Sequence, residues 1–97
     1  MVEDINFELL KAVRNQDIPR AKSLLSAGAN INTTNTFKHT LLMQAARDGE
    51  TAVVDFLIQN GADLNSSDYL GNTALKIAIM NEHPDIAEKL RAAGAKE

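Results

Sequence analysis

Apolar and polar residues form short blocks along the middle of the chain, and the apolar residues recur at helical spacing. The pattern predicts one helix from Leu41 to about Asp48 and a second from about Thr51 to Gln59, with Gly49 breaking the chain between them. Thr40 can cap the first helix, because its hydroxyl can accept a hydrogen bond from an otherwise unpaired backbone N–H. The second helix ends before Gly61, since glycine readily adopts the left-handed conformation that closes a helix.

This block pattern returns every 33 residues along the chain. The matching series are Gly28, Gly61 and Gly94, each followed by alanine; Ala12, Ala45 and Ala78; Leu9, Leu42 and Leu75; Leu24, Leu57 and Leu90; and the loop pairs Asn32/Asn65 and Thr40/Thr73. In the third unit, Thr73 is the expected cap of a helix from Ala74 to about Asn81. Pro84 fits the first turn of the following helix, with His83 or its neighbour as the cap. A fixed period of this length indicates a repeat protein built from one recurring pair of helices.

The longest repeated motifs lie in the second half of each unit. They read Leu-Leu-Ser-Ala-Gly-Ala-Asn-Ile-Asn at 24–32 and Leu-Ile-Gln-Asn-Gly-Ala-Asp-Leu-Asn at 57–65, and Asp-Tyr-Leu-Gly-Asn-Thr-Ala-Leu follows at 68–75. These residues resemble the ankyrin family, whose repeat has about this length. The resemblance implies an all-α fold, an ankyrin-repeat solenoid of helix-turn-helix pairs with β-hairpin-like finger loops. It also implies a single domain, 1–97, with an N-terminal cap at about 2–34, an internal repeat at 35–67 and a C-terminal cap at 68–97.

The sequence departs from the family pattern at two points. The family opens its first helix with Thr-Pro-Leu-His, whereas this chain reads Thr-Leu-Leu-Met at 40–43 and Thr-Ala-Leu-Lys at 73–76. Without the proline and the histidine, we expect a less rigid helix start. Lys38 occupies the turn position that Gly71 fills one repeat later, and a non-glycine residue at positive φ carries strain. We therefore expect this turn either to relax or to have a functional role.

Charged residues replace apolar ones at both ends of the array. We expect Lys11 and Arg20 to form a polar outer face at the N-terminal end, and Lys89 and Arg91 to do the same at the C-terminal end. Solenoids need polar outer faces on their end repeats to stay soluble. The substitutions predict a complete, capped array.

Composition narrows the possible partners and compartment. The 97 residues are 44% apolar, carry a formal net charge of −3 with acids and bases intermixed, and include no cysteine. A chain without a basic patch is not expected to bind nucleic acid. No apolar run is long enough to span a membrane and the first residues are acidic, so we expect a soluble, unexported, cytoplasmic monomer. We expect the sequons at Asn32 and Asn65 to stay unmodified as polar loop residues.

In ankyrin proteins the fingertips and the concave helix face typically contact a protein partner. Carried over by position, the resemblance implies partner contacts at Thr36, Phe37, His39, Tyr69, Leu70 and Asn72 on the fingers, and at Arg14, Asn15, Arg47, Asp48, Met80 and Asn81 at the helix ends. Phe37 and Tyr69 lie in segments too short and polar to bury them, so we expect interface anchors; the alternative is that both fold back onto neighbouring fingers. Phe7 and Phe56 are predicted to be core residues. Arg14 and Arg47 form either a basic strip for an acidic partner or solvated helix ends.

The sequence offers no catalytic or cofactor-binding constellation. We expect His39 on a fingertip and His83 in a turn on the other side of the solenoid, so the two cannot share a site, and the serines have no nearby histidine. Asp48 and Glu50 flank a turn, where acids usually serve the following helix N-terminus. We therefore predict a non-catalytic binding protein without cofactor or metal. The open alternatives are a dedicated regulator of one enzyme and a self-associating structural protein.

Overall fold

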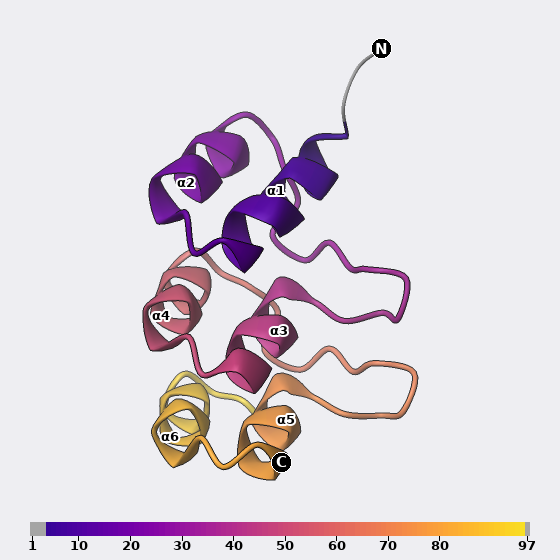
Figure 1. The fold of residues 1–97 in the computed structure, drawn as a ribbon. Coiled ribbons are helices and arrows are strands. Elements are labelled where there is room, and N and C mark those ends of the chain that lie inside the picture. Colours follow the sequence, from indigo (N-terminus) through magenta and orange to yellow (C-terminus); the bar gives the residue numbers. More distant parts are fainter. Residues whose placement is uncertain (1–3, 97) are drawn as a thin grey trace.

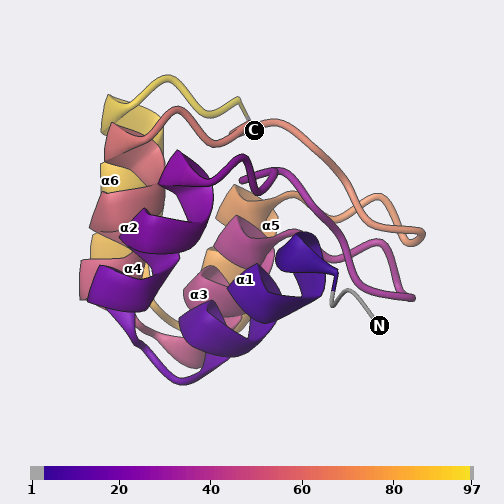
Figure 2. The same cartoon turned by 90° about the horizontal axis from the view of Figure 1, so that it is seen from above.

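The computed structural model describes residues 4–96, which form six helices arranged as three antiparallel pairs (Figure 1). The helices are α1 (Ile5–Arg14), α2 (Ile18–Ser26), α3 (Leu41–Asp48), α4 (Thr51–Gln59), α5 (Ala74–Met80) and α6 (Pro84–Ala92). α1, α3 and α5 stack in one layer and α2, α4 and α6 in a second, with the two long loops projecting from the first layer (Figure 2). This arrangement confirms the all-α solenoid. The repeat boundaries stay a prediction, and positions 2, 3 and 97 lie outside the described residues.

Side-chain caps and glycine set the helix ends where the sequence predicted them. The Thr40 hydroxyl accepts from the backbone N–H of Met43 at 3.1 Å, and the Thr73 hydroxyl accepts from that of Lys76 at 3.2 Å. Thr40 also donates its own backbone N–H to the Met43 sulfur at 3.5 Å, so α3 begins with two reciprocal bonds despite lacking the family proline and histidine. After α4, Gly61 adopts φ +81°, as a helix-closing glycine does.

His83 lies directly before α6, but its side chain does not cap the helix. The residue occupies the predicted N-cap position, but its side chain makes no bond to the helix N-terminus. Instead, its Nε2 lies 3.1 Å from the carbonyl oxygen of Arg47, at the end of α3 in the preceding repeat. Glu50 likewise occupies the N-cap position of α4, and its side chain makes no capping hydrogen bond there.

The core runs through all three repeats between the two helix layers. Equivalent leucines are fully buried in all three repeats of the first layer (Leu9, Leu42 and Leu75) and in the last two of the second (Leu57 and Leu90), whereas Leu24, their first-repeat equivalent, is partly buried. Phe56 is a core residue, as predicted. Phe7 is not, because 55% of its surface is exposed. It aligns with Thr40 and Thr73, the cap positions of α3 and α5, and so lies on an extra turn of α1 that the next helix does not cover.

Asparagine side chains tie consecutive loops together at one-repeat intervals. The Asn32 side-chain oxygen accepts from the backbone N–H of Asp63 at 2.8 Å, and that of Asn65 accepts from Lys96 at 2.9 Å. In the first repeat, Asn6 accepts from Asn30 at 2.7 Å. These bonds give a structural reason for the repeated asparagine that the sequence shows at 32 and 65.

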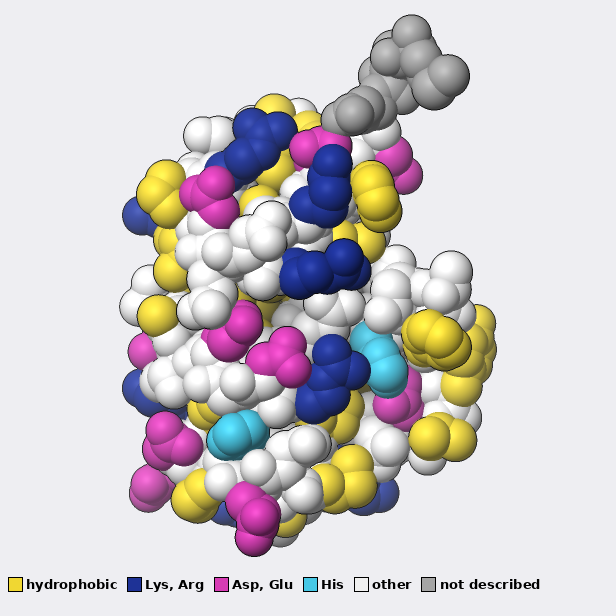
Figure 3. All heavy atoms as spheres, viewed as in Figure 1, with side chains coloured by type: hydrophobic (Ala, Val, Ile, Leu, Met, Phe, Trp, Pro, Cys, Tyr) yellow, Lys and Arg dark blue, Asp and Glu magenta, His cyan; other side chains and the backbone are white. Residues whose placement is uncertain are grey.

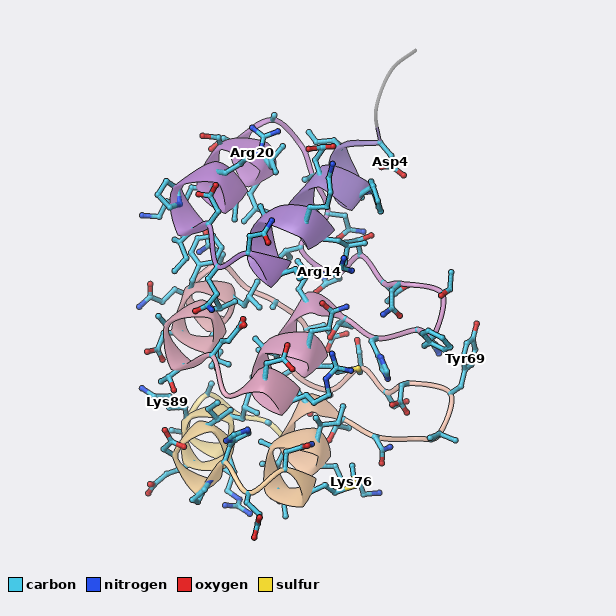
Figure 4. All side chains as sticks on the ribbon, viewed as in Figure 1. Asp4, Arg14, Arg20, Tyr69, Lys76 and Lys89 are labelled. Carbon is cyan, nitrogen blue, oxygen red and sulfur yellow. The ribbon has the colours of Figure 1, made fainter. Side chains whose placement is uncertain are left out.

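Charged groups lie at both ends of the stack, with one correction to the prediction. At the N-terminal end, Glu8 bonds both Lys11, at 2.8 Å, and Arg20, at 3.2 Å. At the other end Arg91 is exposed, as expected. Lys89 is not on the outer face, because its Nζ lies 3.2 Å from a carboxylate oxygen of Asp55 on α4, in the preceding repeat (Figure 4). Among residues 4–96, no helix has the length and hydropathy needed to cross a membrane.

Candidate partner-binding surface

Two loops form the fingers that project beside the first helix layer. We call residues 33–40 finger 1 and residues 66–73 finger 2. In finger 1 the backbone N–H of Asn35 donates to the carbonyl of His39 at 3.1 Å, and in finger 2 that of Asp68 donates to Asn72 at 3.0 Å. The fingers therefore turn back like hairpins. They contain no strand among the described residues, only one isolated antiparallel bridge between Thr34 and Thr40.

A polar side chain holds each finger in its turn. The Asn35 side-chain oxygen accepts the N–H groups of Phe37 and His39 at 2.9 and 3.0 Å. One repeat later, Asp68 Oδ1 accepts those of Leu70 and Asn72, both at 2.9 Å. Such side-chain turns fix a loop by satisfying backbone donors that would otherwise need water.

The turn of finger 1 does not relax around Lys38. Lys38 adopts φ +63°, close to the +80° of the equivalent Gly71, and the backbone bond across the turn is 3.0 Å in both fingers. Of the two expectations for this turn, relaxation is therefore wrong. Lysine here adopts a conformation that costs a non-glycine residue roughly 1–2 kcal/mol.

His39 and Asp68 link the two fingers. His39 Nε2 lies 3.2 Å from Asp68 Oδ2, and the His39 ring centroid is 6.2 Å from that of Phe37. The backbone N–H groups of Asn72 and Leu70, together with His39, hold the pKa of Asp68 below its ordinary value. His39 is half-buried between the fingers, so the expectation that it lies on a free fingertip is wrong.

Apolar side chains project from both fingertips. Phe37 is 68% exposed, Tyr69 76% and Leu70 85%, so the alternative in which the aromatics fold back and become covered is wrong. Phe37 and Leu70 occupy the same repeat position. Figure 3 shows hydrophobic side chains gathered at the outer ends of the fingers, and Figure 4 shows Tyr69 pointing away from the helices.

A groove of about 180 Å³ lies between finger 2 and the helices α3 and α5. It brings together six of the twelve predicted contact residues: His39, Arg47, Leu70, Asn72, Met80 and Asn81. Its floor includes the buried Met43 and Ile77, and Gln44 and Asp68 complete the lining. None of these last four residues was predicted as a contact from the sequence. The Asp-x-x-Gly turn at 68–71 was a signal for Asp68, but the floor residues look like ordinary helix packing in the sequence.

Six predicted contact residues lie outside this groove, among them Asn15, the residue that ends α1, and Thr36, which lines the second groove described below. Phe37 and Tyr69 are at the fingertips, and Asp48 is at the end of α3, where its carboxylate lies 3.3 Å from Arg47 Nε. Arg14 lines a second groove, of about 470 Å³, with Phe7 and finger 1. Because Asp48 neutralises part of the charge of Arg47, the two arginines do not form a purely basic strip. Phe7 belongs to this surface rather than to the core.

The polar groups considered for catalysis have structural partners. His39 pairs with Asp68 and His83 with the Arg47 carbonyl, while the Ser66 hydroxyl donates to Asp63 at 2.9 Å. Burial, with Asp48 nearby, raises the pKa of Glu50. Within residues 4–96, no three histidine, aspartate or glutamate side chains gather in a way that could hold a metal ion.

Comparison with known proteins identifies the repeat. A family model described as three copies of the ankyrin repeat matches residues 9–96. The E3 ubiquitin-protein ligase XBAT33 of Arabidopsis thaliana is 36% identical over 84 residues, covering 84% of this chain and 16% of that protein. The ARF GTPase-activating protein Git of Drosophila melanogaster is 33% identical over 89 residues, covering 91% and 12%. Human Arf-GAP with coiled-coil, ANK repeat and PH domain-containing protein 2 is 33% identical over 78 residues, covering 78% and 10%. The chain thus spans less than a fifth of these relatives.

Proposed function

Because this chain belongs to the ankyrin-repeat family, we propose that it is a non-catalytic module that binds a protein partner through its fingers and its concave helix face. Ankyrin repeats are generally protein-interaction modules. The named relatives are a ubiquitin ligase and GTPase-activating proteins, but the matched segment is 10–16% of their length. We propose that the segment contributes binding rather than chemistry.

The observation that supports the proposal is the pair of exposed apolar residues at equivalent fingertip positions. Phe37 and Leu70 stand one repeat apart, with Tyr69 beside them, and all three are more than two-thirds exposed. Exposed aromatic and aliphatic side chains cost solubility unless they serve an interface, and aromatic residues are frequent anchors of binding energy. The groove behind Leu70 has an apolar floor with His39, Asn72 and Asn81 around it, a combination that suits an apolar partner side chain flanked by hydrogen bonds.

The size of the chain limits the interface. Three repeats offer a face near the standard ~800 Å² per partner and little more. Affinity should therefore depend on a few anchors rather than on total area. We propose that the protein acts as a cytoplasmic monomer, which the absence of cysteine and the mixed surface charge support.

The test is capture by the full chain, immobilised, from an extract of its native host, with quantitative mass spectrometry. The anchor variant carries serine at Phe37, Tyr69 and Leu70. The control variant carries serine at three exposed positions of the other helix layer, Lys22, Gln59 and Glu88. We expect the anchor variant to lose the captured protein and the control to retain it, with both melting near the wild-type temperature. Undiminished capture by the anchor variant would overturn the proposal.

The same experiment separates the alternatives. One stoichiometric partner whose activity changes on binding would favour a dedicated regulator, and several substoichiometric partners would favour an adaptor. Self-association through the fingers would appear as a concentration-dependent sedimentation coefficient at micromolar protein that the anchor variant abolishes. A wholly monomeric profile would remove that third function.

A further inference from the structure

The groove between finger 2 and the helices α3 and α5 lies away from both ends of the stack, since its lining runs from His39 to Asn81. Its volume of about 180 Å³ is below the roughly 300–1,000 Å³ of small-molecule and cofactor sites, so it suits a single side chain of a protein partner. The floor residues Met43 and Ile77 are buried and apolar. We therefore expect the side chain that enters to be apolar.

The carboxylate that lines this groove, that of Asp68, is already bonded within the chain. Its Oδ1 accepts the backbone N–H groups of Leu70 and Asn72, and its Oδ2 lies 3.2 Å from His39 Nε2. The Asp68 side chain is only 4% exposed. It is therefore not placed to meet a cation of a partner, and the groove does not select for basic ligands.

Arg47 is the cation of the same groove, and much of its bonding capacity remains. Its side chain is 50% exposed, and its Nε lies 3.3 Å from Asp48 Oδ1. Exposed pairs of this kind contribute only about 0–1 kcal/mol. The two terminal amino groups of the guanidinium have no bond to any residue in the range 4–96. These groups can pair with a carboxylate in the planar, two-bond geometry that arginine favours.

Two further cations lie on the same side of the molecule. Arg14 is the equivalent of Arg47 one repeat earlier and lines the neighbouring groove beside finger 1. Lys38 is exposed in the turn of finger 1, and neither side chain has a bonding partner within residues 4–96. Arg47 has a helix pair on each side and is still exposed, so exposure at this repeat position does not depend on the end of the stack. Figure 3 shows Lys and Arg side chains along the first helix layer, next to the fingers.

We propose that the partner segment bound by this face is acidic, with one apolar side chain in the groove and Asp or Glu carboxylates on either side of it. The carboxylates would pair with Arg47, Arg14 and Lys38, which we call the finger-face cations. The inference rests on the proposed function and names the chemistry of its partner. It also gives Lys38 a role, because a contact with the partner would offset the roughly 1–2 kcal/mol that its positive φ costs. The net charge of −3 does not oppose it, since charges farther away than about 8 Å are screened at physiological salt.

Nucleic acid is the competing class of ligand, because cations and exposed aromatic residues also suit it. Its affinity for proteins comes largely from the number of phosphates that lysine and arginine neutralise. This face offers the three finger-face cations, and Asp48 lies beside one of them. A phosphate backbone also has no apolar group for the floor of the groove. Binding of an oligonucleotide is therefore an outcome of the test that would contradict the proposal.

The test selects ligands for the immobilised full chain from a phage-displayed library of random peptides. A length of about 12 residues spans roughly 40 Å when extended, which matches the longest axis of the molecule, 41 Å. We expect the enriched peptides to contain Asp or Glu at least about twofold more often than the starting library, near a large apolar residue. The most enriched peptide is then synthesised with a fluorescent label, and its Kd is measured by anisotropy. Its binding should weaken as salt rises.

Point variants locate the binding. Arg47→Glu should weaken the labelled peptide about tenfold and Arg47→Gln severalfold. Lys22→Glu makes the same charge change on α2, in the other helix layer, and should alter Kd less than about twofold at physiological salt. A peptide with one acid replaced by lysine should bind Arg47→Glu more tightly than wild type, because the charges of the pair are then exchanged. Arg47 and Lys22 are exposed, so the variants are expected to fold, which circular dichroism checks.

Several results would overturn the proposal. These are the enrichment of no peptide, enrichment of peptides no more acidic than the library, and equal weakening by Arg47→Glu and Lys22→Glu. Tighter binding of an oligothymidylate than of the labelled peptide would also overturn it and assign the face to nucleic acid. The proposed function fails separately, in the capture experiment with the anchor variant. Enriched peptides that lack acids but lose binding to the anchor variant would refute the acidic partner and leave the fingers as a binding surface.

Discussion

Replacement by alanine should cost different amounts of stability at two glycines that follow helices, Gly49 and Gly61. Gly49, after α3, has φ +73°, and Gly61, after α4, has φ +81°, so alanine meets nearly the same backbone strain at both. Their surroundings differ. A Cβ added at Gly61 meets nothing within 4 Å, whereas one added at Gly49 would lie 2.8 Å from Cε1 of the His83 ring. Non-bonded carbon atoms do not approach so closely, so the His83 ring must move.

The magnitudes follow from these two terms. The left-handed conformation costs alanine roughly 1–2 kcal/mol at either site. At Gly49 the displaced ring also gives up the bond of 3.1 Å between His83 Nε2 and the Arg47 carbonyl, which is worth about 1 kcal/mol. We therefore expect Gly49→Ala to cost about 1 kcal/mol more than Gly61→Ala. For a domain of this size, that difference is a further fall of about 4–8 °C in Tm.

Urea denaturation followed by circular dichroism measures both variants, and a His83→Ala background provides the control. His83→Ala removes the obstacle, so the two glycine variants should then cost the same. The slope of unfolding free energy against urea should stay constant across the set, because the exposed area hardly changes. Two results would show that the contact with His83 does not cause the extra cost at Gly49. One is an equal loss of stability for both glycine variants in the wild-type background. The other is a larger loss for Gly49→Ala that persists in the His83→Ala background.

Four further substitutions test the fingers and the core. Lys38→Gly should stabilise the chain by about 1 kcal/mol, because it relieves a positive φ; a lower urea midpoint would contradict this. Phe56→Ala should cost about 3–5 kcal/mol and Phe7→Ala less than about 1, and similar Tm losses would contradict the observed burial. Hydrogen bonds to the Asp68 carboxylate, above all the one from the backbone N–H of Asn72, hold the pKa of Asp68 below its ordinary 3.8. The folded state therefore binds fewer protons than the unfolded state. Stability from Asp68 is present above about pH 3.8 and is lost as pH falls below it, so Asp68→Asn should lose less stability on acidification than wild type in urea titrations at stepped pH.

Local chemistry explains why the helices were predictable. Thr40, Thr73 and Gly61 act on backbone groups within a few residues of themselves, so their caps depend little on the rest of the fold. Because the pattern repeats every 33 residues, a helix boundary found in one repeat predicts the equivalent boundary in the next. The bounds of α3 and α4 agree with the prediction for this reason.

The errors arose where a residue's neighbour in space belongs to another repeat. Phe7 lies on a turn of α1 that has no counterpart in α3, so helical spacing alone could not show its exposure. Lys89 was assigned to the outer face, but its partner Asp55 is 34 residues away in sequence. His39 was expected at a tip because the sequence does not reveal that Asp68 of the next finger lies beside it. Predicting which side chains meet across repeats requires the geometry of stacking. The repeat pattern shows that the repeats stack, but not which side chains they bring together.

The link between His39 and Asp68 bears on the proposed role of the fingers in binding a partner. Asp68 uses one oxygen to hold its own finger and the other to bond the neighbouring finger, whereas Asn35, its equivalent, only holds its own. The two tips that carry Phe37 and Leu70 are therefore tied one repeat apart before any partner arrives. Anchors held at a fixed spacing lose less conformational freedom on binding, which matters most for a small interface. The groove floor, in contrast, includes the buried core residues Met43 and Ile77. Substitutions there would change the stability of the stack as well as binding, so the two effects could not be separated. The fingertips are therefore the place where the proposed recognition can be tested separately from stability.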